Sequence, residues 1–334
     1  MSTGPAVDGV LVQWGERLFY PGNRIVRPTQ TPRLDTMTRR KAAVIRGRIH
    51  ATVARRAPQV MVKVTGGGRG MAAIAAHFRY ICKNGRLPME DDRGTVREGK
   101  EAMRDVVEQW RHGGSLIENV GHRREAFNIM LSMPSGTDPL VVQKAAREFA
   151  KAELHGHRYV MVLHDHQANP HVHLSVRAES LTGERLNPRK KDLHRWRETF
   201  AEKLRGWGVE AEATRQATRG ANRNHDPLWR VKASGEGRLR QPASASKSGE
   251  RYLASRGGAM EAWAHILKAL STSEMPDDRQ LASSITRYVR ESPFFREQML
   301  QRQQRELHAA DPRRPQRMPQ PDIAVTRRGP ELER

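Results

Sequence analysis

Four histidines lie within ten positions of the sequence, in the stretch "LHDHQANPHVHLSV" (163–176). Successive side chains of a β-strand point to opposite faces of its sheet. In the last part of this stretch, His171 and His173 therefore share one face with Ser175, while the apolar residues between them share the other. Imidazoles held on one face of a rigid strand are typical of a divalent-metal site that keeps open positions for a substrate.

A third imidazole is expected from the preceding strand. "HRYVMVLH" (157–164) ends on His164, and the polar stretch that follows, with Asn169-Pro170, predicts a hairpin. The hairpin would bring His164 beside the other two histidines. His166 is in phase with His164, so it is an alternative third ligand or a bystander in the turn. Three imidazoles from two adjacent strands predict a metal site, whereas a lone histidine on a strand is usually structural or solvated.

The composition of the whole chain indicates a polyanionic partner. The 334 residues include 59 Lys and Arg against 37 Asp and Glu, a formal net charge of +22. Such a surplus is typical of nucleic-acid-binding proteins and, less often, of proteins at anionic membranes. The single cysteine, Cys82, excludes intramolecular disulfides, and no apolar run approaches the roughly 20 residues that span a bilayer. These features predict a soluble cytoplasmic protein without membrane insertion.

The elements around the histidines predict an α+β fold. Their order is strand, helix, helix, strand, helix, strand, strand, helix, which favours an antiparallel central sheet with helices packed mainly on one face. Thr137 is the expected cap of the third helix, with Pro139 in its first turn. The strands are expected at 59–67, 125–136, 157–164 and 171–180, and the helices at 70–84, 96–111, 137–154 and 191–205.

The histidine pattern also resembles a known family. His164, followed by Asn169-Pro170-His171-Val172-His173, resembles the third motif of conjugative relaxases, the histidine–hydrophobic–histidine nickases of plasmid mobilisation and T-DNA processing. The resemblance implies a nuclease that cuts one DNA strand with a tyrosine, placed in a helix just after the first strand. It also implies a divalent metal ion, Mg²⁺ or Mn²⁺, although imidazole ligands alone would favour later transition metals.

A tyrosine stands where the resemblance implies one. "HFRYICKNGRL" (77–87) resembles the first motif of the same family, and the carry-over assigns Tyr80 as the nucleophile. The apolar residues of this helix form one stripe at helical spacing, and Tyr80 lies off it. A tyrosine on a helix usually packs in a core, so the off-stripe position favours the catalytic role. Lys83, close by, is a candidate DNA-phosphate contact.

A third stretch is similar to the second family motif, a strand followed by a Ser/Gly turn. In "LSMPSGTDP" (131–139), Ser132 and Ser135 are candidate phosphate contacts, together with the amides at the start of the next helix. Ser-Gly turns before helices are common in proteins. This motif therefore supports the resemblance only in company with the other two.

Two positions depart from the family pattern. The family often has an acidic residue two positions after the first histidine, where this chain has His166, with Asp165 one position earlier. Asp165 is therefore the candidate for orienting a ligand histidine, and His166 is a candidate base for the tyrosine. The family asparagine four positions after the last histidine is Arg177 here. Because Arg177 shares a face with His173, we expect it to bind a phosphate.

Together these features predict site- and strand-specific nicking and rejoining of DNA at a transfer origin. Attack by Tyr80 would leave a 5′-phosphotyrosyl DNA and a free 3′-hydroxyl, so rejoining needs no ATP. Two alternatives stay open: a phosphodiesterase that uses metal-bound water, and a non-catalytic DNA-binding accessory protein. The implied partners are single-stranded and supercoiled DNA at the origin, accessory mobilisation proteins and a secretion coupling protein.

The relaxase-like nuclease domain is expected to cover 58–222, about half the chain. Before it, 1–57 is expected to be a basic, mostly disordered arm. After it, 223–257 has the Ser, Gly and Ala content of a linker, 258–308 is expected to be a helical extension, and 309–334 a disordered basic tail.

Overall fold

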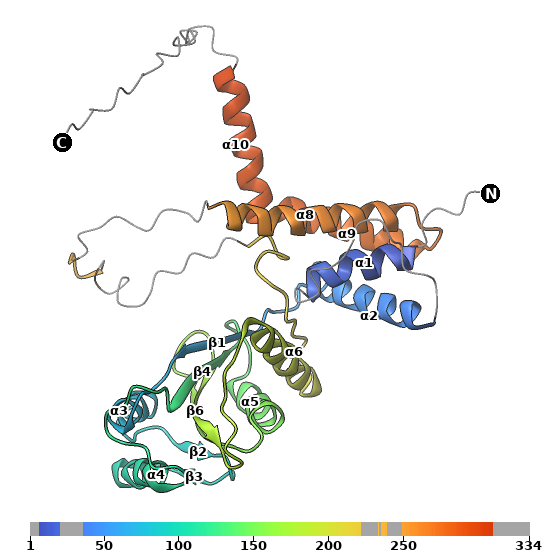
Figure 1. The fold of residues 1–334 in the computed structure, drawn as a ribbon. Coiled ribbons are helices and arrows are strands. Elements are labelled where there is room, and N and C mark those ends of the chain that lie inside the picture. Colours follow the sequence, from blue (N-terminus) through green and yellow to red (C-terminus); the bar gives the residue numbers. More distant parts are fainter. Residues whose placement is uncertain (1–6, 21–35, 222–232, 234, 239–248, 310–334) are drawn as a thin grey trace, which may run out of the picture.

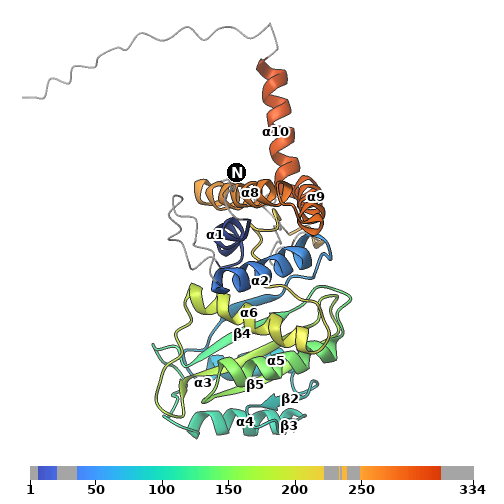
Figure 2. The ribbon, with the colours of Figure 1, turned by 90° about the vertical axis from the view of Figure 1, so that its right-hand side faces the viewer.

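The computed structural model describes residues 7–20, 36–221, 233, 235–238 and 249–309, which form two units (Figures 1 and 2). The helical unit contains α1 (Val7–Phe19), α2 (Thr36–Val53), α8 (Glu250–Ser271) and α9 (Pro276–Glu291), and α10 (Pro293–Ala309) extends from it. The sheet unit contains β1 (Met61–Gly66), α3 (Met71–Ile81), β2 (Met89–Asp91), β3 (Val96–Arg97), α4 (Lys100–His112), β4 (Ala126–Ser132), α5 (Pro139–Glu153), β5 (His157–His164), β6 (His171–Ser180) and α6 (Lys190–Gly206).

The sheet is antiparallel throughout, with the strand order β1-β4-β6-β5-β2-β3. The predicted α+β class and antiparallel sheet are therefore confirmed. The hairpin strands β5 and β6 have the predicted limits, and they place His164 directly opposite His171. The short strands β2 and β3, which add to the sheet beyond β5, were not predicted, because three and two residues are too few to show a periodic pattern.

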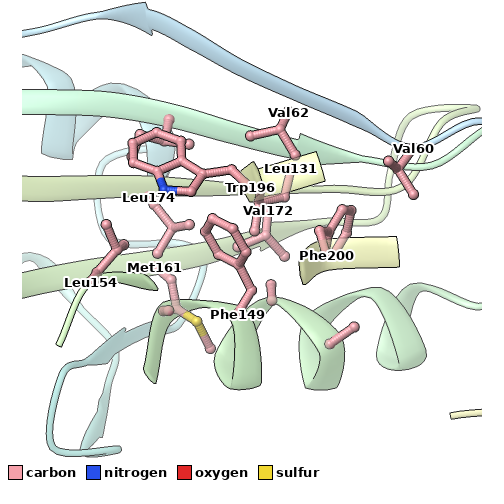
Figure 3. Close-up of a cluster of buried hydrophobic side chains, with 14 of the residues drawn as sticks. Val60, Val62, Leu131, Phe149, Leu154, Met161, Val172, Leu174, Trp196 and Phe200 are labelled. Atoms are coloured by element: carbon pink, nitrogen blue, oxygen red, sulfur yellow. The ribbon is translucent and has the colours of Figure 1, made fainter. Parts of the chain in front are cut away.

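One face of the sheet packs against α5 and α6. Val172, Leu174 and Val176, at every second position of β6, belong to the core on this side and are fully buried. Figure 3 shows Val172 and Leu174 among them. Phe149 from α5 meets Trp196 from α6 edge to face, with ring centres 6.1 Å apart. The predicted cap of α5 is wrong by one residue, since the Asp138 carboxylate accepts from the Leu140 amide at 2.9 Å. The Thr137 hydroxyl instead donates to the Pro134 carbonyl.

The other face carries α3 and α4, so helices cover both faces and not mainly one. Phe78 of α3 and Trp110 of α4 meet edge to face, with ring centres 4.9 Å apart. They pack with Val160 and Val162 of β5, which point to the histidine side of the sheet. β5 carries apolar residues on both of its faces, which is typical of a strand buried on both sides. This second core is what holds α3 against the histidines.

The helical unit corrects the prediction that 1–57 is a mostly disordered arm. Leu11 and Leu18 of α1 and Ile45 and Ile49 of α2 are buried in one core with Trp263 of α8. Segments at the two ends of the described chain therefore form one packed unit (Figure 2). The apolar side chains of α1 and α2 pack against α8 and α9, which are about 200 residues later in the chain. A local stretch of sequence does not show this contact.

The C-terminal part is helical, as predicted, but its boundary differs. α8 begins at Glu250, so 250–257 belong to a helix and not to the predicted linker. Most of the remaining predicted linker, and 310–334 of the predicted tail, lie outside the described residues. Within the described part of the chain, no helix is both long and apolar enough to cross a membrane.

Candidate active site

Three histidines converge at the end of the β5–β6 hairpin. His164, His171 and His173 are each buried, and their ring centres lie 4.7–5.0 Å from one another. One nitrogen from each ring lies within 4.8 Å of those of the other two. His164 faces His171 across the strand pair, and Val162 faces His173, so strand register alone sets this spacing. We call these three residues the histidine trio.

Backbone carbonyls fix the orientation of two rings in the trio. Nε2 of His164 lies 2.6 Å from the Ile81 carbonyl, and Nδ1 of His171 lies 2.9 Å from the Asn169 carbonyl. A carbonyl oxygen only accepts hydrogen bonds, so each of these nitrogens carries the proton. The other nitrogen of each ring therefore keeps its lone pair. A hydrogen bond from the second ring nitrogen to a carbonyl is the usual support of a metal-bound histidine.

The trio fits a divalent cation. Among the described residues, no hydrogen-bond partner reaches Nδ1 of His173, which is buried. Burial, with the neighbouring histidines adding to it, lowers the pKa of His173 to about 3. Burial also lowers the pKa of His164 and of His171. All three imidazoles are therefore neutral at neutral pH, which is the form that ligates a metal.

Tyr80 presents its phenol beside the trio. It lies on α3, its side chain is 64% exposed, and its ring centre is 6.1 Å from that of His173. The bond from His164 to the Ile81 carbonyl ties the trio to the residue that follows Tyr80. The hydrogen bond, between residues 83 apart in the chain, thus fixes the tyrosine helix against the histidine hairpin. The phenol is accessible to a large substrate, whereas the trio is enclosed.

A fourth histidine, His77, completes the surroundings of Tyr80, and the sequence predictions missed it. It lies one helical turn before Tyr80, with ring centres 6.4 Å apart, and its Nδ1 is 2.8 Å from the Ser175 hydroxyl. That hydroxyl donates to Oδ1 of Asn128, so Nδ1 of His77 donates and Nε2 keeps a lone pair. Burial lowers the pKa of His77 to about 4. The signal in the sequence was its position three residues before Tyr80 on the same helix face.

Comparison with known proteins agrees with this geometry. Residues 80–209 match the family model "Relaxase: MobA/VirD2-like, nuclease domain". This part of the chain is therefore similar to the nuclease domain of MobA/VirD2-like relaxases. The chain is also 24% identical over 183 residues to the T-DNA border endonuclease VirD2 of Rhizobium radiobacter. That match covers 48% of this chain and 43% of the relative, so it spans less than half of the relative's length.

The structure places the other predicted site residues in different environments. Lys83 is exposed at the end of α3, in a left-handed conformation with φ 49°, and its charge contributes to lowering the pKa of His164. His166 is exposed in the hairpin turn, with its ring centre 5.1 Å from that of His164. The converging group contains His164 and not His166, so the alternative of His166 as third ligand is not supported.

Asp165 was predicted to orient a ligand histidine, but backbone carbonyls bond to two of the histidines instead. Asp165 is exposed, and the carbonyls of Ile81 and Asn169 orient two of the histidines instead. Backbone acceptors are invisible to a search for acidic residues, because any residue type supplies them. Asp165 is therefore not the orienting group.

The two serines of the second motif behave differently from each other. Ser132 is buried next to the trio, and its hydroxyl donates to the Pro170 carbonyl at 3.3 Å. It therefore does not reach solvent, and the prediction that it binds phosphate is wrong. Ser135 is exposed in the turn after β4, where its amide donates to Oδ1 of Asn169 at 2.9 Å. Ser135 stays a candidate phosphate contact.

Arg177 is a structural residue and not the predicted phosphate clamp. Its side chain is buried, and its guanidinium donates to the carbonyls of Trp110, in the last turn of α4, and of Ser115. It shares a face with His173, as predicted, but α4 covers that face at this point of β6. The arginine therefore satisfies a buried carbonyl at the C-terminal end of α4, a favourable place for a cation, and a second carbonyl just beyond the helix.

Replacing Arg177 by methionine should destabilise the sheet unit without weakening DNA binding. The carbonyl of the buried residue Trp110 loses its donor, which costs about 1–3 kcal/mol, whereas the carbonyl of the exposed residue Ser115 can bind water instead. We expect urea unfolding to show a loss of about 1–3 kcal/mol, and the affinity for single-stranded DNA to stay unchanged at a temperature where the variant is folded. Wild-type stability together with weaker DNA binding would restore the phosphate-clamp role.

Proposed function

We propose that the protein cuts and rejoins one strand of DNA, with Tyr80 as the nucleophile. The observation that carries the proposal is the meeting of an accessible phenol with a buried histidine trio from a distant hairpin. The match of residues 80–209 to a relaxase nuclease model supports the same reaction class. The net charge of +22 supports a polyanionic substrate.

The chemistry is a phosphodiester exchange. The Tyr80 oxygen forms a bond to phosphorus, and the bond from phosphorus to the 3′ oxygen of the preceding nucleotide breaks. The products are a 5′-phosphotyrosyl strand and a free 3′-hydroxyl, so the reverse reaction needs no energy source. His164, His171 and His173 would hold a divalent ion, Mg²⁺ or Mn²⁺ by family resemblance or another transition metal, whose positive charge offsets the charge that builds on the phosphate oxygens.

The phenol must lose its proton as it attacks, and we assign the acceptor to His77. Its lowered pKa keeps the ring neutral at neutral pH, and its hydrogen bond to Ser175 leaves Nε2 free to accept. His77 thereby replaces His166, the base expected from the sequence. Tyr159 offers a contrast, because burial raises the pKa of its phenol to about 12. A tyrosine in that position is a poor nucleophile.

The wider assignment follows from the nuclease chemistry. We propose that the strand cut lies at a transfer origin on supercoiled DNA and that cutting initiates mobilisation. A secretion coupling protein and accessory mobilisation proteins are the partners that such a role requires, and the cytoplasm is its compartment. The name of the relative, a T-DNA border endonuclease, supports a role in processing DNA at a defined border.

Incubating the protein with plasmid carrying its transfer origin and Mn²⁺ should yield a covalent protein–DNA adduct. On a denaturing gel, the labelled strand should migrate with the protein and be released by protease. Free cut ends would instead indicate hydrolysis by metal-bound water. Uncut DNA with a retarded band on a native gel would indicate a non-catalytic accessory protein.

A further inference from the structure

A second feature of the sheet unit lies on the flank of the tyrosine helix. A groove of about 400 Å³ runs between α3 and α4, which lie side by side in Figure 1. None of the histidine trio lines it, so it is distinct from the site described above. Four basic side chains and one acid, Glu108, are among the residues that line it.

The groove concentrates positive charge that the protein does not neutralise. Four cations line it, and all four are exposed: Arg79, Arg86, Lys100 and Arg104. No carboxylate of the described residues lies within ion-pair distance of any of them; the lining acid, Glu108, pairs with Arg111 at 3.5 Å. Lys100 and Arg104 are four residues apart on one helix, where like charges repel. A cluster of unpaired cations attracts anions.

The two sides of the groove are held in a fixed position. Gly85, in the turn after α3, has φ 84°, and its carbonyl accepts from the Gly99 amide at 3.0 Å. A Cβ at Gly85 would lie 2.6 Å from the Gly99 carbonyl carbon, so only glycine permits this contact. The contact holds Arg86, next to Gly85, against the α4 end that carries Lys100. The cations therefore face the groove without a loop having to order itself.

The groove is also within reach of a strand that lies on Tyr80. Arg79 and Tyr80 are consecutive, so their side chains leave α3 about 100° apart. Around the helix, the surface between the Tyr80 side and the Arg79 side carries the exposed, small residues Ala72 and Ala76. A helix is about 10 Å across with its side chains, and alanines allow a polymer backbone to cross it closely.

We propose that this groove binds phosphates of the single-stranded DNA that flanks the scissile phosphate, after the strand has crossed α3 from Tyr80. The inference rests on the proposed function for the identity of the strand. The occupant is a polynucleotide backbone because the cations are separate, exposed and unpaired. The groove would hold the substrate strand in place while Tyr80 and the trio act on a single phosphate.

Binding of a fluorescein-labelled oligothymidylate, measured by anisotropy without metal at several salt concentrations, tests the groove. The variant is Arg86→Gln with Arg104→Gln, both on the surface and outside the helix that carries Tyr80. We expect at least about a tenfold weaker affinity at low salt and a salt slope reduced by about 1.4, since each phosphate contact to single strands contributes about 0.7. The matched control removes two exposed arginines of the helical unit, Arg251→Gln with Arg287→Gln, and should keep the wild-type slope.

A groove variant with wild-type affinity and slope, or a control variant with the same loss, would overturn the inference. Adduct formation by the wild-type protein is measured in parallel. If the wild type forms no adduct while the groove variant loses oligothymidylate binding, the proposed function fails and the groove stands. If the wild type forms the adduct and the groove variant binds normally, the groove assignment alone fails.

Discussion

Replacing Tyr80 by phenylalanine should abolish the covalent protein–DNA adduct and leave the protein folded. The substitution removes one oxygen from a side chain that is 64% exposed, so neither core loses a contact. Loss of a covalent nucleophile lowers rates by several orders of magnitude. We expect adduct formation to fall by at least about 10³-fold on the denaturing gel. The affinity for single-stranded DNA should stay within about twofold, because the hydroxyl reacts and does not anchor the strand.

Tyr252→Phe is the matched control for this substitution. Tyr252 lies on α8 in the helical unit, partly exposed and remote from the histidine trio. It should form the adduct at the wild-type rate. If Tyr80→Phe still nicks and leaves free ends, attack by water is the mechanism. If it still forms the adduct, another residue is the nucleophile and the assignment of Tyr80 is wrong.

The parts of the site that the sequence predicts are those set by local periodicity. A strand alternates with period two, so His171 and His173 had to share a face once β6 was recognised. The hairpin then placed His164 opposite His171 through register alone. Tyr80 was assigned by the family resemblance, and helical periodicity agreed with the assignment because a position off the apolar stripe leaves the side chain exposed.

The parts that the sequence does not predict depend on contacts between distant segments. Arg177 has the residue type of a phosphate ligand, but the end of α4 lies over it and offers two carbonyls. The trio is oriented by backbone oxygens of Ile81 and Asn169, which no side-chain motif encodes. His77 acquires its role through Ser175, which is 98 residues away in the chain.

The helical unit shows a different limit, because its first helix has a local helical pattern that the prediction of a disordered arm did not use. In "VDGVLVQWGERLF" the apolar residues recur at helical spacing, with Leu11, Trp14 and Leu18 on one side. The Arg, Pro and Gly content of 1–57 favoured disorder when it was weighed over the whole segment. Burial against α8 decides the outcome, since an isolated helix of 13 residues is marginal in water.

Removing one histidine of the trio should abolish both metal binding and nicking. In His173→Gln, the buried site loses a neutral imidazole that the surrounding protein cannot replace. Loss of a residue that only orients a ligand weakens metal binding by about 10–100-fold, so loss of the ligand itself should cost at least about 100-fold. Mn²⁺ should raise the melting temperature of the wild type in proportion to the logarithm of its concentration and leave that of the variant unchanged.

His166→Gln provides the control, and pH provides a second measurement on the same site. His166 is exposed and outside the converging group, so its variant should keep the Mn²⁺ shift. An ordinary imidazole with a pKa near 6.5 loses about tenfold in its neutral fraction at pH about 5.5, and three would lose about 10³-fold in affinity. Burial lowers the pKa of all three ligands, that of His173 to about 3, so protons compete only at lower pH. Between neutral pH and pH about 5.5, Mn²⁺ affinity should therefore fall by much less than 10³-fold. A 10³-fold fall over that range would contradict a metal site made by the trio. Loss of the Mn²⁺ shift in His166→Gln, as in His173→Gln, would contradict it as well.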